Sequence, residues 1–218
     1  MPVAIFCSIT STILKMGMET LVSVLTIFGT YLFALACMIA VYSLLILLKG
    51  RLIPVPLLRK YAPIMLQVFS MSSSNASIPI NMEVCGKKLG IGRKVYSLSI
   101  PLGATINMDG TCINLAVFSL AIAKAYGVEI TGSAIFSLVI TIFVLSMGAP
   151  GIPGVGLICL SVLLTQIGIP VEAVGLVMGI DSLVGMFNTM INCLGDVSIT
   201  TIVAKSEGLI DIVRYKAT

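Results

Sequence analysis

Several stretches of this sequence run for longer than a membrane is thick without a charged residue. The clearest extends from Thr20 to Leu48, between Glu19 and Lys49. About 20 apolar residues in a helix cross the hydrocarbon core of a bilayer, so this stretch is long enough for a transmembrane helix. Only 10% of the residues are charged, against about 25% in a typical soluble domain. The sequence therefore predicts an all-α integral membrane protein, and it excludes an ordinary soluble enzyme or a disordered chain.

The residue types that usually carry out catalysis or bind zinc are scarce. The chain has no His, so it lacks the commonest general base and the commonest zinc ligand. Its six Cys form no C-x-x-C pair, and we interpret them as small buried hydrophobic residues. The net charge of +4 comes from short basic clusters between apolar stretches, which mark cytoplasmic loops. We therefore expect no enzyme activity, no nucleic-acid partner and a lipid bilayer around the chain.

One apolar stretch, Tyr61–Met82, has basic clusters on both sides, which include Lys60 and Lys87. If basic loops stay in the cytoplasm, both ends of this stretch lie on the same side of the membrane. A straight span cannot satisfy that condition, but a re-entrant hairpin with two arms of about 11 residues can. Its tip falls in Ser72–Pro79, where polar backbone at membrane depth requires cover by protein or a water-filled cavity. The pattern therefore predicts a hairpin tip that lines a site.

Charges and chain breaks divide the whole sequence into six segments. Residues 130–171 carry no charge but contain a Gly- and Pro-rich break at Gly148–Gly154, so they form either two spans or a second re-entrant hairpin. The expected segments are two N-terminal membrane helices, the first one partial, in 1–48; re-entrant hairpin one with its basic flanks in 49–94; a broken helix with the sequence NMDGT in 95–124; hairpin two in 130–171; a last helix in 172–205; and a cytoplasmic tail in 206–218.

The chain also repeats itself loosely. One broken hairpin precedes a span with Asn107 and Asp109, and the other precedes a span with Asn192 and Asp196. Because the hairpins enter from opposite sides, this is the pattern of an inverted repeat, which in secondary transporters surrounds the binding site.

Three acids lie inside the spans, and each must be compensated. A carboxylate at the bilayer centre costs about 2.5–3.5 kcal/mol, and a cation, a proton, a helix N-terminus or hydrogen-bond donors can offset that cost. For Asp181, near the start of its span, we favour a helix N-terminus. For Asp109 and Asp196 we favour a hard cation such as sodium, which takes oxygen ligands.

Four motifs, in order along the chain, resemble those of the dicarboxylate/amino acid:cation symporter family, which has the glutamate-transporter fold: SSSNASIP, NMDGT, GAPGIPG and GIDSLVGMFNTMINCLGD. The resemblance implies the family's fifth and sixth helices, hairpin one, helix seven, hairpin two and helix eight. The family's first four helices, which supply much of its trimeric scaffold, have no counterpart in this sequence. The resemblance further implies a multi-pass homotrimer in the inner or plasma membrane that carries a small-molecule substrate together with sodium.

Carried over position by position, the resemblance assigns residues to sodium, the coupling ion, and to substrate. The sodium positions are Gly103, Asn107, Asn192 and Asp196 in one site; Thr105 with backbone oxygens of Ser146, Met147 and Ala149 in a second; and Asn107 with Asp109 in the covered part of a third. The substrate positions are Ser73, Ser74, Thr111, Ile152, Gly156, Gly185, Asn188, Thr189 and Asn192.

Two of the substrate positions depart from the amino-acid transporters of the family. Gly185 stands where they carry the Asp that holds the substrate amine, and Asn188 stands where they carry the Arg that holds a side-chain carboxylate. The bidentate clamp that an Arg provides is therefore absent. Leu115 replaces the Glu of potassium-coupled members. We expect a small organic acid, an amino acid or a related polar solute as substrate, with acidic amino acids the least supported.

Two other interpretations stay open. An intramembrane aspartyl protease needs two facing acids, and Leu194-Gly195-Asp196 is a faint match to such a motif. The chain also begins inside apolar sequence, so it could be a non-transporting fragment, or a half-transporter that needs a partner for the missing N-terminal helices.

Overall fold

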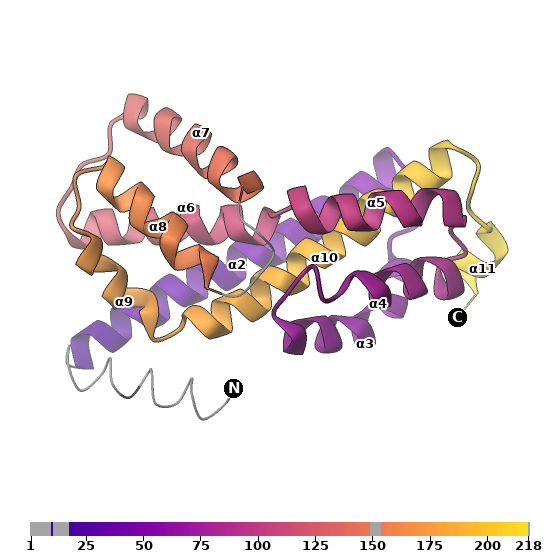
Figure 1. Ribbon diagram of the computed structural model, residues 1–218, viewed down its shortest axis with the longest axis horizontal. Coiled ribbons are helices and arrows are strands. Elements are labelled where there is room, and N and C mark those ends of the chain that lie inside the picture. The colour runs from indigo at the N-terminus through magenta and orange to yellow at the C-terminus, as the bar shows by residue number, and fades with distance from the viewer. Residues whose placement is uncertain (1–9, 11–17, 149–153, 218) are drawn as a thin grey trace. The chain divides into compact units, whose positions relative to one another are not determined.

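The computed structural model describes residues 10, 18–148 and 154–217, and within this part the chain is helical (Figure 1). An isolated antiparallel bridge joins Ile91 and Ile210. The helices are α2 (Met18–Leu48), α3 (Val55–Met71), α4 (Ile78–Glu83), α5 (Arg93–Ile106), α6 (Asp109–Ala125), α7 (Gly132–Gly148), α8 (Val155–Gln166), α9 (Gly175–Met178), α10 (Asp181–Ser206) and α11 (Ile212–Lys216), with a π-helical turn η1 (Val84–Lys88) and a 3-10 turn η2 (Val171–Val174).

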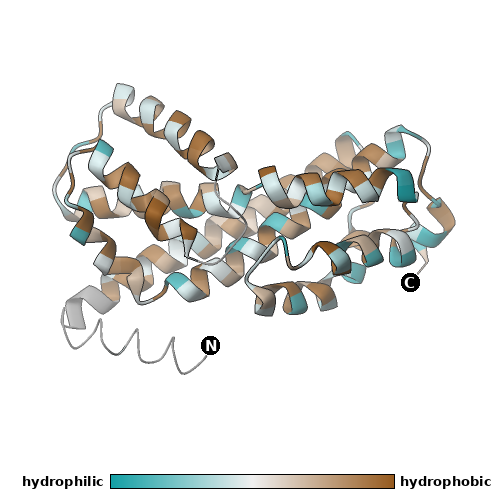
Figure 2. Cartoon of the chain, in the orientation of Figure 1, coloured by the Kyte–Doolittle hydropathy of each residue, from teal (hydrophilic) through white to brown (hydrophobic). Residues whose placement is uncertain are grey.

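Two segments of the described chain are long and apolar enough to cross a membrane, Val22–Leu48 and Arg93–Ala125. A third is added if Val171–Met178 and Asp181–Ser206, which meet at an 80° bend, form one span. Hydrophobic residues occur along all the long helices (Figure 2), and many of the large ones are exposed; Phe33 of α2, for example, is 71% exposed. Extended apolar surface of this kind suits a membrane or another protein rather than water. The expected all-α class with apolar, membrane-compatible helices is confirmed.

The chain divides into two compact units. Unit one comprises Met1–Leu35 and Thr111–Gly185, and unit two comprises Ala36–Gly110 and Met186–Thr218. Helices α2, α6 and α10 contribute residues to both units.

In unit two, α3 and α4 are joined by a tight turn. Ser72 caps the C-terminus of helix α3, and its φ of 51° is left-handed, a common conformation at a helix C-terminus. The turn closes with a bond of 3.1 Å from the amide of Ser77 to the carbonyl of Ser73. The buried hydroxyl of Tyr61 on α3 donates to Asn81 Oδ1 on α4 at 2.7 Å. Because this bond lies away from the turn, it fixes the two arms along their length.

In unit one, α7 and α8 lie side by side (Figure 1). Gln166 at the end of α8 donates to Ser137 Oγ on α7 at 2.7 Å. On α2, Tyr31 packs edge-on against Phe118 of α6 and donates to the carbonyl of Val184 at 3.2 Å. These contacts hold the start of α10 and the body of α6 against α2.

Candidate functional site

The candidate site in unit two is centred on Asp196, a residue of α10 that is only 3% exposed. Asn107 Nδ2 donates to Asp196 Oδ1 at 3.0 Å and to the carbonyl of Asn192 at 3.2 Å. The other carboxylate oxygen, Asp196 Oδ2, is buried and has no hydrogen-bond partner within the described part of the chain. A buried carboxylate oxygen without a donor is costly, so this atom is suited to receive a positive charge.

Gly103 forms the wall of this site on the α5 side. A Cβ atom at this position would collide with the Asp196 carboxylate, so the close approach of α5 to α10 requires a glycine. The carbonyl of Gly103 accepts the amide of Asn107 at 2.7 Å in the last turn of α5. The structure thus brings together all four residues of the first predicted sodium site: Gly103, Asn107, Asn192 and Asp196.

A helix break at Asn107 and Met108 shapes the site. Helix α5 ends at Ile106 and α6 begins at Asp109, and Asn107 between them is extended, with φ −91° and ψ 95°. A break of this kind leaves amides at the start of the second helix without an intrahelical partner. Asn192 Oδ1 accepts one of them, from Gly110, at 2.7 Å, and Asn192 Nδ2 contacts Met108 Sδ at 3.3 Å. Asn192 therefore holds the broken segment against α10.

Asp109 has a partner that the sequence did not suggest. The hydroxyl of Tyr42 on α2 donates to Asp109 Oδ2 at 2.5 Å, and Asp109 also lies in the first turn of α6, where the helix dipole favours negative charge. Gly195 makes room for this arrangement, because a Cβ there would lie 2.5 Å from the Tyr42 hydroxyl and 2.6 Å from Asn107 Nδ2. The sequence indicates this contact only weakly, by a tyrosine within the charge-free stretch Thr20–Leu48.

The residues of the second predicted sodium site fall in different parts of the chain. Thr105 in unit two donates its hydroxyl to the carbonyl of Pro101 at 2.9 Å. Ser146 in unit one donates to the carbonyl of Phe143 at 2.9 Å and accepts from Cys112 Sγ at 3.0 Å. Met147 follows on α7, and Ala149 lies outside the described residues. This site remains a prediction.

Most of the predicted substrate positions in unit two are buried polar residues. Ser74 is in the turn after α3, and Asn188, Thr189 and Asn192 follow one another along α10. Ser73 Oγ accepts the amide of Ala76 at 3.3 Å within the same turn. These residues supply hydroxyl and amide groups, and none of them is charged, so they suit hydrogen bonding to a polar solute.

The other substrate positions belong to unit one. A Cβ atom at Gly156, in the first turn of α8, would lie 3.4 Å from Asn114 Nδ2 and 3.8 Å from Asp181 Oδ1. At Gly185 a Cβ would meet no atom within 4 Å, so the position to which the resemblance assigns an Asp in amino-acid transporters has room for a side chain. Thr111 is in the first turn of α6, and Ile152 lies outside the described residues.

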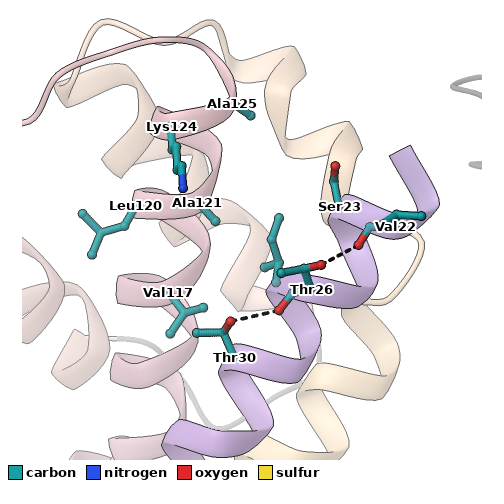
Figure 3. A pocket seen from close by; sticks show the side chains of 10 residues that line it. Val22, Ser23, Thr26, Thr30, Val117, Leu120, Ala121, Lys124 and Ala125 are labelled. Atoms are coloured by element: carbon teal, nitrogen blue, oxygen red, sulfur yellow. Dashed lines mark hydrogen bonds between the residues drawn. The ribbon is translucent and has the colours of Figure 1, made fainter. Parts of the chain in front are cut away.

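A separate cavity of about 670 Å³ lies in unit one between α2 and α6 (Figure 3). Its walls are mainly apolar, and Thr26 and Thr30 turn their hydroxyls to carbonyls one turn earlier on α2, at 2.8 and 2.9 Å. The predicted sodium and substrate residues are not among those that line it. We therefore do not assign this cavity to the candidate site.

Comparison with known proteins identifies the family of this chain. Residues 1–206 match the model of the sodium:dicarboxylate symporter family. The chain is 33% identical over 182 residues to excitatory amino acid transporter 3 of Mus musculus, and this alignment covers 81% of the chain and 35% of that protein. It is 31% identical over 200 residues to an excitatory amino acid transporter of Caenorhabditis elegans, and this alignment covers 89% of the chain and 39% of that protein. The chain thus spans about a third of the length of these curated relatives. The family and these relatives are transporters rather than enzymes, and the chain belongs to the sodium:dicarboxylate symporter family, which confirms the resemblance seen in its motifs.

Proposed function

We propose that this chain forms the ion- and substrate-binding part of a secondary active transporter of the inner or plasma membrane. It carries a small organic acid, an amino acid or a related polar solute together with sodium. The observation that carries this proposal is the buried carboxylate of Asp196, which has one oxygen bonded to Asn107 and the other without a partner in the described chain.

Sodium fits this donor set. It is a hard cation and prefers carboxylate, amide and backbone carbonyl oxygens, which Asp196, Asn192 and Gly103 provide at one place. Its charge would offset the cost of a carboxylate within the membrane, about 2.5–3.5 kcal/mol. Asp109 has Tyr42 and a helix N-terminus as partners, so we assign it to a separate sodium position, with Asn107 as the second ligand.

The remaining assignments extend this proposal to coupling. Thr105 with backbone oxygens of Ser146, Met147 and Ala149 would form a further sodium position, and hairpin two would act as the gate over the substrate. The α3–α4 and α7–α8 pairs would be the two re-entrant hairpins of an inverted repeat. By family resemblance the assembled protein would be a homotrimer.

The test is a sodium titration of the melting temperature of the purified chain, with choline replacing sodium at constant ionic strength. A ligand that binds only the folded state adds about 2.7 kcal/mol of stability at 100 times its Kd. We expect Asp196→Asn and Asp109→Asn each to abolish or strongly reduce this stabilisation. Glu207→Gln, which removes one negative charge from an exposed residue of unit two, should respond as wild type. An unchanged sodium response in both Asp variants would refute the assignment.

Uptake distinguishes a complete transporter from a part of one. Sodium-driven uptake into liposomes that contain this chain alone would show that no other segment is required. Sodium-dependent stabilisation without uptake would support the alternative of a half-transporter that needs a partner.

A further inference from the structure

Unit two contains a small basic pocket between the start of α3 and the end of α11. Its volume is about 300 Å³, and it is lined by Val55, Pro56, Arg59, Lys60, Lys216 and Ala217. These residues are distinct from the predicted sodium and substrate positions.

Lys60 has a structural role in this pocket, because its ammonium group is bonded to the protein backbone and not left for a ligand. Its Nζ donates to the carbonyls of Lys88 at 3.0 Å, Arg214 at 2.5 Å and Tyr215 at 3.0 Å. An ammonium has three donor hydrogens, so all of them are used. The hydroxyl of Tyr215 donates to the carbonyl of Ile53 at 2.8 Å, and burial raises its pKa to about 12, so it stays protonated. These bonds fix α11 beside the start of α3.

The two remaining basic side chains, Arg59 and Lys216, are exposed and free to bind an anion. Among the described residues, the ion pair in the structure joins Lys87 to Glu83, so neither Arg59 nor Lys216 has an acidic partner. The first turn of α3 adds further positive potential, because it has neither an acidic residue nor a side-chain cap. Two cations beside an uncapped helix N-terminus are the usual surroundings of a bound phosphate.

The pocket is also close in sequence to the end of a candidate membrane span. It follows the candidate span Val22–Leu48 after a short loop. Ile53, Val55 and Val213, beside the pocket, are 58%, 62% and 82% exposed. Apolar side chains next to free cations suit an amphiphile, whose acyl chains cover the former while its headgroup meets the latter.

The charge distribution of the chain favours the same ligand. Unit two holds eleven of the 13 Lys and Arg residues but five of the nine Asp and Glu residues. Hydrophilic residues gather around α11 and the loops next to it (Figure 2). Basic clusters at the end of a span face the cytoplasmic leaflet, whose lipids are negatively charged.

We propose that this pocket binds the phosphate of an anionic phospholipid headgroup, with Arg59 and Lys216 as its charge partners and Lys60 as the structural anchor. The site is independent of sodium and substrate. A soluble phosphate ester shares the same chemistry, so the experiment must separate the two sources.

Native mass spectrometry of the purified full chain tests the proposal, with phosphatidylglycerol as the probe and phosphatidylcholine as the uncharged comparison. The test variant is Arg59→Gln with Lys216→Gln. The matched control is Arg93→Gln with Lys94→Gln, which removes the same charges from exposed residues of the same unit. We expect the test variant to bind phosphatidylglycerol about 30-fold more weakly, because each basic residue near an anionic surface contributes about fivefold. The control should retain wild-type affinity.

Further variants keep the result interpretable. The charge-conserving exchange Arg59→Lys with Lys216→Arg should retain most of the binding, and if it does not, charge is not what holds the lipid. Equal losses in the test and control variants would mean diffuse surface attraction and would overturn the site, as would no loss in either. Displacement of the lipid by millimolar glycerol 3-phosphate would assign the pocket to a soluble phosphate ester instead.

Discussion

Glycines have different surroundings in the two units. In unit two, a Cβ at Gly103 would strike the Asp196 carboxylate, and one at Gly195 would lie within 2.6 Å of two polar atoms. In unit one, a Cβ at Gly29 or Gly185 would meet no atom within 4 Å. Gly103 and Gly195 therefore allow close packing around the candidate sodium site, whereas Gly29 and Gly185 stand in open space.

The hydrogen bonds around the candidate sodium site and those of α7 differ in the same sense. Around the site they join segments far apart in sequence, as from Tyr42 to Asp109 and from Asn107 to Asp196. On α7 of unit one, Thr141 and Ser146 donate to carbonyls of their own helix. A site that must discriminate between ions benefits from fixed geometry, and a gate needs room to rearrange. The contrast supports the proposed division between a preformed ion site and a mobile hairpin two.

The strongest way to break this contrast is Gly103→Ala. The new methyl group has to displace the Asp196 carboxylate, so we expect the variant to lose the sodium-dependent rise in melting temperature. Overpacking should also cost about 1–3 kcal/mol of unfolding free energy. Gly185→Ala serves as the control and should keep the sodium response. A normal sodium response of Gly103→Ala would mean that sodium does not bind at Asp196.

Tyr61→Phe tests whether α3 and α4 are joined as firmly as the structure indicates. It leaves Asn81 Oδ1 without its donor, beside an Nδ2 that already lacks a partner in the described chain. An unsatisfied buried polar group costs about 1–3 kcal/mol, and thermal or denaturant unfolding measures that loss. Tyr126→Phe changes an exposed tyrosine in unit one and should alter stability by less than about 0.5 kcal/mol. Equal effects of the two substitutions would remove the distinction between the units.

The open space at Gly185 in unit one allows a larger side chain to be introduced there. The double variant Gly185→Asp with Asn188→Arg introduces, one turn apart on α10, the two charges that the resemblance assigns to amino-acid transporters at these positions. We expect affinity for L-aspartate to rise about tenfold or more, since a hydrogen bond to a charged group contributes about 1.5–3 kcal/mol. Calorimetry in sodium, against a panel of amino acids and carboxylic acids, measures the change. Micromolar binding of aspartate to the wild-type chain would refute our interpretation of the substrate positions Gly185 and Asn188.

The smallest effect should come from Gly29→Ala on α2. Its Cβ meets no neighbour, and alanine is the better helix former by about 1 kcal/mol or less. We expect a slightly higher melting temperature, whereas Gly195→Ala on α10 should lower it. A loss of stability at Gly29 would show that unit one is packed more closely than the structure indicates.

The motifs in the sequence indicate polar residues that the structure brings together, but not the partners of those residues. Asn192 and Asp196 lie four residues apart and therefore share a helix face, and Asn107 bonds the side chain of Asp196 and the backbone carbonyl of Asn192. Tyr42 could not be predicted as the partner of Asp109, because no local spacing relates residues 67 positions apart. The structural role of Lys60 could not be predicted either, since a basic residue beside a span is usually read as a marker of a cytoplasmic loop. Long-range pairing is set by packing, which a local pattern does not encode.

The three bonds of Lys60 have a consequence for how the protein is made. Two of the three acceptors belong to Arg214 and Tyr215, and Arg214 is 154 positions further along the chain. At about 5–20 residues per second, the ribosome adds that length in roughly 8 to 30 s. Throughout this interval Lys60 has been synthesised, but the two carbonyls that it will bind have not. The start of α3 is therefore made well before the contacts that fasten it to α11 can form.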